Sequence, residues 1–228
     1  MMERHTSSRF DEELHNLHNM TMEMAKLCES QLHIIRRFLK DEIPLNVLQE
    51  IETLDDKIDR YHVDINLEAT RLIAKRAPVA IDLRYISATF RIVTDLERIG
   101  DECCKIGRFL RKEQVNPQIR VWREIGAVTR LAKNLLTRTI DMLARSDAEA
   151  AYLLINDDAE LDETYHSTAR LIASYMIEDA SIITQSIDVL MAAKALERIG
   201  DHCINIAEAI IFAQEGKDIR HQSNRDKA

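Results

Sequence analysis

Pairs of carboxylate side chains four residues apart occur at four places in the chain. The pairs are Asp55 with Asp59, Glu97 with Asp101, Asp158 with Asp162, and Glu197 with Asp201. On a helix such residues share one face, where two like charges repel by about 0.2–0.5 kcal/mol. A hard cation or an iron-type metal would offset this repulsion, because carboxylate oxygens are among its preferred ligands. The eight acids are therefore candidate metal ligands, and the simpler interpretation of each pair is a solvated helix face.

The elements that must position these acids are long helices. Apolar residues recur every three or four positions, and only five Gly and three Pro punctuate the chain, which is too little turn chemistry for a many-stranded sheet. Breaks in the pattern delimit six predicted helices, over residues 8–40, 45–76, 79–113, 118–145, 147–177 and 180–215. Because long helices joined by short loops pack antiparallel, we predict an all-α fold.

The third and sixth predicted helices carry the same block of sequence. Residues 96–101 read LERIGD, residues 196–201 repeat it, and the match continues to Ile106 and Ile206. An internal repeat of this length predicts two tandem three-helix bundles related by a pseudo-twofold axis. We place the first bundle at residues 1–115, the second at 116–215 and a polar tail at 216–228.

Helical geometry predicts where the acids of each repeat lie. Relative to the apolar stripe of the sixth helix, Glu197 and Asp201 point roughly 100–170° away, toward a groove or solvent. We therefore expect one acidic cluster on the outside of each bundle, with one pair from its second helix and one from its third. Gly100 and Gly200 lie inside helices, where Gly costs about 1 kcal/mol relative to Ala. This cost predicts either close helix packing or room beside the acids.

A second metal pattern fits the sequence less well. Glu12-x-x-His15 and Glu163-x-x-His166 match the Glu-x-x-His element of di-iron helical bundles. Such a site needs its ligands turned inward, whereas the periodicity turns Glu163 outward. No GxSxG elbow, catalytic Cys-His signature or Gly-rich phosphate loop occurs, so we predict that the protein is not an enzyme.

Charge and composition narrow the class of partner. The net charge is −8, and Lys and Arg form no basic stripe, so we expect no nucleic-acid partner. The first 25 residues lack the apolar region of a secretory signal, and no segment predicts a membrane span. We expect a cytoplasmic protein that meets membranes only through partners. The four cysteines lack CxxC spacing and are expected to be reduced; they are Cys28, Cys103, Cys104 and Cys203. Cys103 and Cys203 fall on apolar helical positions, which predicts small core residues.

Three segments together resemble the PhoU family. They are the KRAPVAIDLR segment at residues 75–84 and the two ERIGD blocks at residues 97–101 and 197–201. The resemblance extends from about Phe10 to His221. The second half lacks the upstream segment, and Ile183-Thr184 stands where Leu83-Arg84 would be expected. This difference predicts a contact in the first half that the second half does not make.

The resemblance implies a pair of three-helix bundles, in agreement with the periodicity, and a regulatory function. Members of this family restrain phosphate-starvation signalling by linking the ATPase subunit of the phosphate ABC transporter to a membrane sensor histidine kinase. The resemblance also implies a homodimer that requires no cofactor, with iron or zinc clusters held by E/D-x-x-x-D motifs in some members. All four acid pairs match that motif. The alternatives are a metal-binding or metal-buffering protein and a purely structural helical scaffold.

Overall fold

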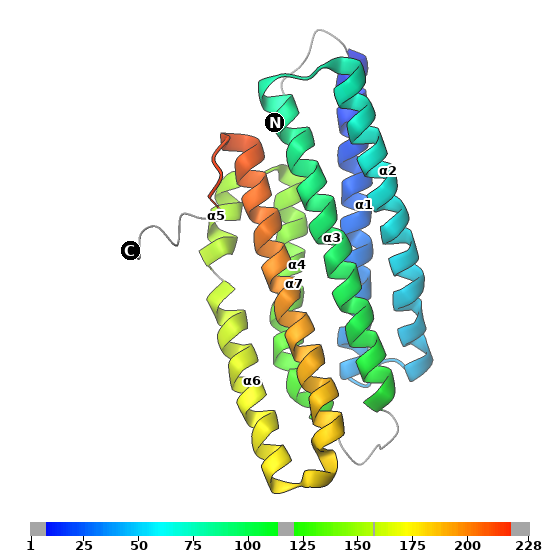
Figure 1. Cartoon of the computed structure of the whole chain (residues 1–228), viewed down its shortest axis with the longest axis vertical. Coiled ribbons are helices and arrows are strands. Elements are labelled where there is room, and N and C mark those ends of the chain that lie inside the picture. The colour runs from blue at the N-terminus through cyan, green and yellow to red at the C-terminus, as the bar shows by residue number, and fades with distance from the viewer. Residues whose placement is uncertain (1–7, 114–120, 157, 220–228) are drawn as a thin grey trace.

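The computed structural model describes residues 8–113, 121–156 and 158–219, and these residues form helices and no strand (Figure 1). The α-helices are α1 (Ser8–Leu39), α2 (Glu50–Arg76), α3 (Ala80–Glu113), α4 (Gly126–Arg145), α5 (Ala148–Asn156), α6 (Asp158–Glu178) and α7 (Ile183–Glu215). Short 3-10 helices precede α2, α4 and α7: η1 (Leu45–Gln49), η2 (Val121–Ile125) and η3 (Ala180–Ile182). The all-α prediction is confirmed.

The predicted helical ranges agree closely with these bounds. The second and sixth ranges each open with a 3-10 turn before the α-helix begins, and η2 lies near the start of the fourth range. The range predicted for the fifth helix holds α5 and α6, and residue 157 between them lies outside the described residues. The boundary predicted between residues 115 and 116 also lies outside them, so the domain limits stay a prediction.

Three helices end where the chain turns into the left-handed conformation. The residue after α2 is Ala77 (φ 46°), the residue after α4 is Ser146 (φ 50°), and the residue after α7 is Gly216 (φ 74°). A residue in this conformation turns its N–H back toward the last carbonyls of the helix, and glycine adopts it without steric cost. Ala77 donates to the Ile73 carbonyl in this way.

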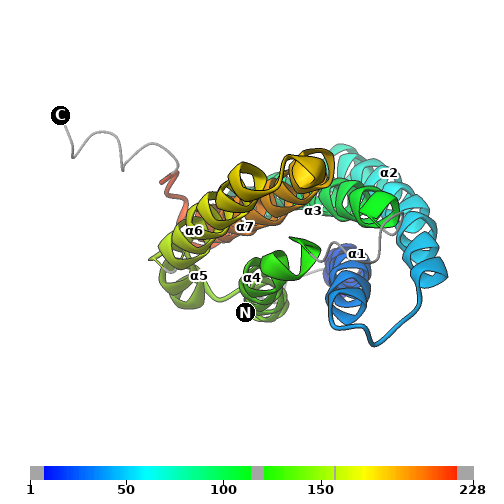
Figure 2. The ribbon, with the colours of Figure 1, turned by 90° about the horizontal axis from the view of Figure 1, so that it is seen from below.

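The helices form two layers. The outer layer is curved and holds α2, α3, α7 and α6 side by side, while α1 and α4 lie behind it (Figure 2). Helices α1 to α3 form the first bundle and α4 to α7 the second. Helices α3 and α7 run antiparallel at the centre and make the most extensive helix–helix contact, and α1 also packs against α4. The two repeats are thus related by a pseudo-twofold axis that passes between α3 and α7.

One hydrophobic core runs through both bundles. The repeated apolar residues occupy equivalent places in it, because Ile99 and Ile199 are both fully buried, as are Ile106 and Ile206. Trp122 of η2 packs 5.9 Å from Phe38 of α1, between ring centroids, and so anchors the start of the second half on the first. All four cysteines are free and buried, which confirms the core positions predicted for Cys103 and Cys203 and adds Cys28 and Cys104. Within the described residues, no helix has the length and apolarity needed to cross a membrane.

Candidate functional site

The two acid pairs of the first half lie on the neighbouring helices α2 and α3. Burial raises the pKa of the Asp55 carboxyl, and the neighbouring carboxylates Asp59 and Asp101 raise it further. Burial also raises the pKa of Glu97, with additional repulsion from Asp101 and Asp59. Asp55 of α2 also lies against Gly100 of α3, the residue before Asp101, so acids of the two helices face each other. The predicted juxtaposition of the second and third helices of the bundle is therefore correct.

Asp55 lies in a cradle that glycine makes possible. A methyl group added at Gly100 would stand 2.7 Å from Asp55 Oδ1 and 3.2 Å from Ile58 Cδ1, both on α2. Gln31 of α1 is fully buried, and its amide donates to Asp55 Oδ1 at 3.3 Å and to the Ile51 carbonyl at 2.9 Å. Gly100 therefore serves both expected purposes, because it leaves room for the acid and lets α2 approach α3 closely.

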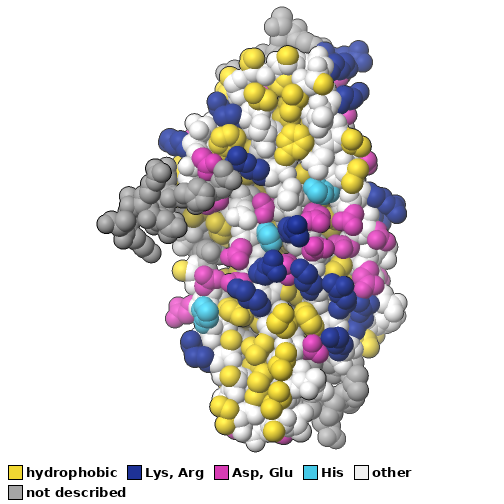
Figure 3. All heavy atoms as spheres, in the orientation of Figure 1, with side chains coloured by type: hydrophobic (Ala, Val, Ile, Leu, Met, Phe, Trp, Pro, Cys, Tyr) yellow, Lys and Arg dark blue, Asp and Glu magenta, His cyan; other side chains and the backbone are white. Residues whose placement is uncertain are grey.

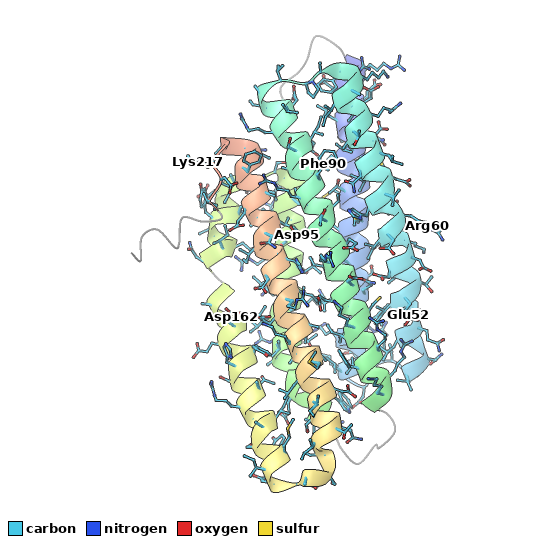
Figure 4. The ribbon with its side chains drawn as sticks, viewed as in Figure 1. Glu52, Arg60, Phe90, Asp95, Asp162 and Lys217 are labelled. Atoms are coloured by element: carbon cyan, nitrogen blue, oxygen red, sulfur yellow. The ribbon has the colours of Figure 1, made fainter. Side chains whose placement is uncertain are left out.

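Acids of the second half meet between α6 and α7. Burial raises the pKa of Asp201, and Glu197 and Asp162 add repulsion; Asp162 lies on α6 (Figure 4). The remaining predicted acid, Asp158, opens α6, but its side chain lies outside the described part of the chain. Glu197 is only 12% exposed. Its side chain is therefore largely shielded from solvent.

Only one of the two carboxylate oxygens of Glu197 accepts a hydrogen bond. Its Oε1 accepts from Lys194 Nζ at 2.5 Å, whereas its buried Oε2 has no hydrogen-bond partner among the described residues. A buried carboxylate oxygen without a partner is costly, and carboxylate donors suit a hard cation, iron or zinc. Within the described residues, however, no group of three or more His, Cys, Asp or Glu is arranged to hold a metal ion.

The two arginines of the repeated block have different partners. Arg98 stays beside its own block, 3.5 Å from Glu97 and 3.8 Å from Asp101, as an exposed ion pair. Arg198 instead reaches from α7 to Glu102 of α3 at 3.0 Å. The Glu102 side chain is 2% exposed and also accepts from Lys105 at 2.9 Å. A buried carboxylate therefore ties the two repeats together.

A second polar contact crosses between α3 and α7. Asp95 of α3 points toward α7 (Figure 4), where its Oδ1 lies 2.8 Å from His202 Nδ1 and 3.0 Å from Asn205 Nδ2. Sequence reasoning missed Asp95, Glu102 and His202, because the search for repeated residues passes over positions where the halves differ. The available signal was a position beside the apolar stripe that holds a charged or polar residue whose type differs between the repeats, such as Glu102 and His202.

The basic residues of the upstream segment hold α2 against α1. Arg76 donates twice to Glu13, at 2.8 and 3.0 Å, and Lys75 donates to it at 3.1 Å. The Arg76 hydrogen bond is the main cause that lowers the pKa of Glu13 to about 2. These contacts lie at the end of the first bundle, away from the acidic clusters.

The KRAPVAIDLR segment occurs only in the first half, and Arg84 of this segment makes a long-range contact. From α3 it crosses to the end of α7, where its Nε lies 3.5 Å from the Ala213 carbonyl and its side chain lies against Gly216. Thr184 stands at the corresponding position of the second half, and its side chain is too short for an equivalent contact. Arg84 is therefore a candidate for the predicted contact of the first half, and the equivalent region that Thr184 would meet, at the end of α3, lies largely outside the described residues.

The di-iron alternative is excluded by the directions of its candidate ligands. The four candidate ligands are all exposed to solvent and so do not face the interior of a bundle; they are Glu12, His15, Glu163 and His166. An inward-facing carboxylate and imidazole site cannot form from them.

Comparison with known proteins agrees with this architecture. The PhoU domain family matches twice, over residues 21–110 and 125–210. A phosphate-specific transport system accessory protein PhoU homolog from Burkholderia sp is 33% identical over 226 residues, covering 98% of this chain and 96% of the relative. The accessory protein PhoU of Escherichia coli K12 is 29% identical, covering 96% of this chain and 91% of that protein.

Solved structures share the fold. The crystal structure of PhoU from Pseudomonas aeruginosa has a TM-score of 0.84 at 33% identity, covering 91% of this chain and all of that one. The phosphate transport system regulatory protein PhoU from Streptococcus pneumoniae has a TM-score of 0.83 at 22% identity, covering 92% and 98%, and shows the fold alone. With two matching domains in the same order and relatives that match over nearly the whole length, the chain belongs to the PhoU family.

Proposed function

We propose that this protein is a regulatory accessory of a phosphate-specific transport system and has no chemistry of its own. The observation that carries the proposal is the family match over both halves, since the relatives are named as accessory proteins of such systems. Three of the four thiols support a non-enzymatic role. Burial raises the pKa of Cys28, Cys103 and Cys104, so these groups stay protonated and are poor nucleophiles.

The finer proposal is that the protein links two partners in the cytoplasm. One is the ATPase subunit of the phosphate ABC transporter, and the other is the sensor histidine kinase of the phosphate response. A body with one continuous core can present fixed contact surfaces to both. If it binds one state of the ATPase more tightly than the other, the transporter state shifts the population that engages the kinase. High phosphate then keeps the starvation response off.

A deletion strain tests this function. We expect alkaline phosphatase expression to become constitutive in high phosphate and to return to normal when the gene is restored. Purified protein should bind both the ATPase subunit and the kinase in pull-downs. Unchanged phosphatase expression in the deletion strain would reject the adaptor function. Cell fractionation and light scattering check the accompanying proposals of a cytoplasmic location and a homodimer.

Metal binding is a second candidate role, favoured by the unpartnered Oε2 of Glu197. Iron or zinc at the acidic clusters would lower the repulsion that raises the pKa values of Asp55, Glu97 and Asp201. The candidate ligands are the eight acids of the four pairs, and the adaptor function does not require them to be occupied.

Metal analysis of protein purified without chelator tests this role. The four acids of the repeated blocks are replaced together by their amides, with helicity followed by circular dichroism. Metal content should fall while helicity stays. Equal metal content in the wild type and this variant would reject the ligand assignment.

A further inference from the structure

A groove lies between α1 and α2, at the edge of the first bundle. Its volume is about 330 Å³, within the range of pockets that hold small molecules. Its lining residues are Glu23 and Leu27 of α1, and Lys57, Arg60, Tyr61 and Asp64 of α2. At about 100° per residue, the four residues of α2 lie on the side of that helix opposite to Asp55 and Asp59. Arg60 stands at the outer edge of α2 (Figure 4).

The two cations of this groove are unpaired. Lys57 and Arg60 are exposed, and neither makes an ion pair or hydrogen bond with any residue that the structure describes. On the face shown in Figure 3, by contrast, Lys and Arg lie among Asp and Glu across the middle of the molecule. Because residues three apart on a helix are neighbours, Lys57 and Arg60 can both donate to one phosphate group.

The middle of the groove is apolar and aromatic. Tyr61 and Leu27 are half-buried and pack against the core, while the rest of each side chain lines the groove. Aromatic side chains of this kind bind the planar bases of nucleotides by stacking. The groove therefore offers a base a stacking surface directly beside the unpaired cations.

The far end of the groove is acidic. Asp64 follows Lys57 by seven residues on the same helix, which places their Cα atoms about 10 Å apart at 1.5 Å per residue. Its carboxylate has no hydrogen-bond or ion-pair partner within the described ranges, whereas Glu23 is held by Lys26 at 2.7 Å. Asp64 can therefore accept a hydrogen bond from the far end of a ligand whose anionic end lies at Lys57.

The second half does not repeat this groove. By the spacing of the acid pairs, residues 158–167 correspond to residues 55–64, and Glu160, Glu163 and Thr164 replace the two cations and the tyrosine. The groove that Glu160 lines, between α4 and α6, has a volume of only about 180 Å³. The basic and aromatic groove is thus specific to the first half and is no consequence of the duplicated plan.

We propose that this groove binds an adenine nucleoside 5′-phosphate. Lys57 and Arg60 hold the phosphate, the base stacks on Tyr61, and Asp64 accepts from the 6-amino group. The phosphate and the amino group of an extended adenosine 5′-monophosphate (AMP) are separated by a distance comparable to that between Lys57 and Asp64. The inference goes beyond the adaptor function and does not depend on it.

Titration calorimetry of the full-length chain with AMP tests the site. AMP should bind with a Kd below about 1 mM, and Lys57→Gln and Arg60→Gln should each weaken binding about tenfold, because each removes a charge-assisted hydrogen bond to the phosphate. Arg130→Gln, which replaces an exposed cation of α4 outside the groove, is the matched control and should bind as the wild type does. Circular dichroism checks that each variant is folded.

A second ligand tests the role of Asp64. Inosine 5′-monophosphate (IMP) has a carbonyl where AMP has the 6-amino group, so it turns an acceptor toward the Asp64 carboxylate. The wild type should therefore bind IMP about tenfold more weakly than AMP. An amide side chain both donates and accepts, so Asp64→Asn should bind AMP and IMP about equally.

The remaining outcomes overturn the inference. Wild-type affinity for AMP in both Lys57→Gln and Arg60→Gln would place the nucleotide elsewhere. Inorganic phosphate binding as tightly as AMP would show that the groove recognises only an anion, and an unchanged preference for AMP in Asp64→Asn would remove the contact to the base. Absence of AMP binding by the wild type at millimolar concentration also overturns the inference. Each of these results leaves the adaptor function standing.

Discussion

Replacement of Gly100 by alanine tests whether glycine is needed at the contact of α2 and α3. Helix propensity alone favours Ala by about 1 kcal/mol. Against this, the new methyl group would stand 2.7 Å from Asp55 Oδ1 and 3.2 Å from Ile58 Cδ1, so the Asp55 carboxyl or the whole of α2 must move. Overpacking of a tight contact costs about 1–3 kcal/mol.

Movement of Asp55 carries a further cost. Its Oδ1 accepts from Gln31 at 3.3 Å, and a hydrogen bond of this kind contributes about 0.5–1.5 kcal/mol. Together these terms exceed the gain in propensity. We expect Gly100→Ala to lower the free energy of unfolding by about 1–3 kcal/mol, measured by urea unfolding followed with far-UV circular dichroism.

The chain supplies a matched control for this substitution. Gly126 begins α4, and a methyl group added there meets nothing within 4 Å. Gly126→Ala should therefore be neutral or stabilising by up to about 1 kcal/mol. In an Asp55→Ala background, Gly100→Ala should cost at least about 1 kcal/mol less than in the wild type, because the nearest obstacle is gone. The steric reasoning is refuted if Gly100→Ala stabilises as Gly126→Ala does, or if its cost is the same with and without Asp55.

Three further predictions concern ion pairs and a helix end. Arg198→Met should lower the free energy of unfolding by about 1–2 kcal/mol, because it removes a partner of the buried Glu102 carboxylate. Arg98→Met, at the exposed equivalent position, should change the free energy of unfolding by less than about 0.5 kcal/mol. Equal effects of Arg98→Met and Arg198→Met in urea unfolding would contradict this prediction. For Glu13, whose pKa is lowered from 4.5 to about 2, the ionised carboxylate stabilises the fold above its unfolded pKa, and this contribution is lost as pH falls toward 2. The stability difference between wild type and Glu13→Gln should accordingly shrink in unfolding curves from about pH 5 to pH 2, and a constant difference would argue against the ion pair. Ala77→Gly should raise the melting temperature, since Ala77 has a φ of 46° and a left-handed residue other than Gly costs about 1 kcal/mol; a lower melting temperature would show that chain entropy outweighs this strain.

The periodicity of the sequence was enough to predict the helices and the duplicated plan. A helix buries one stripe of residues every three or four positions, so Ile99, Ile106 and their counterparts could be assigned to the core without knowing what they pack against. The tight contact at Gly100 could be anticipated in the same way, because a costly residue inside a helix needs a local reason. These features depend on local geometry, which is the same wherever the helix lies.

The polar contacts between helices could be identified only from the tertiary structure. Arg98 and Arg198 occupy identical sequence surroundings, yet one stays in its own block and the other crosses to Glu102. Gln31 lies more than twenty residues from Asp55 in the chain, and only the packing of α1 on α2 brings its amide to that carboxylate. Which polar group meets which depends on the rotation and offset of packed helices. Small shifts in these quantities change the hydrogen-bond partner while leaving the apolar pattern of the sequence unchanged.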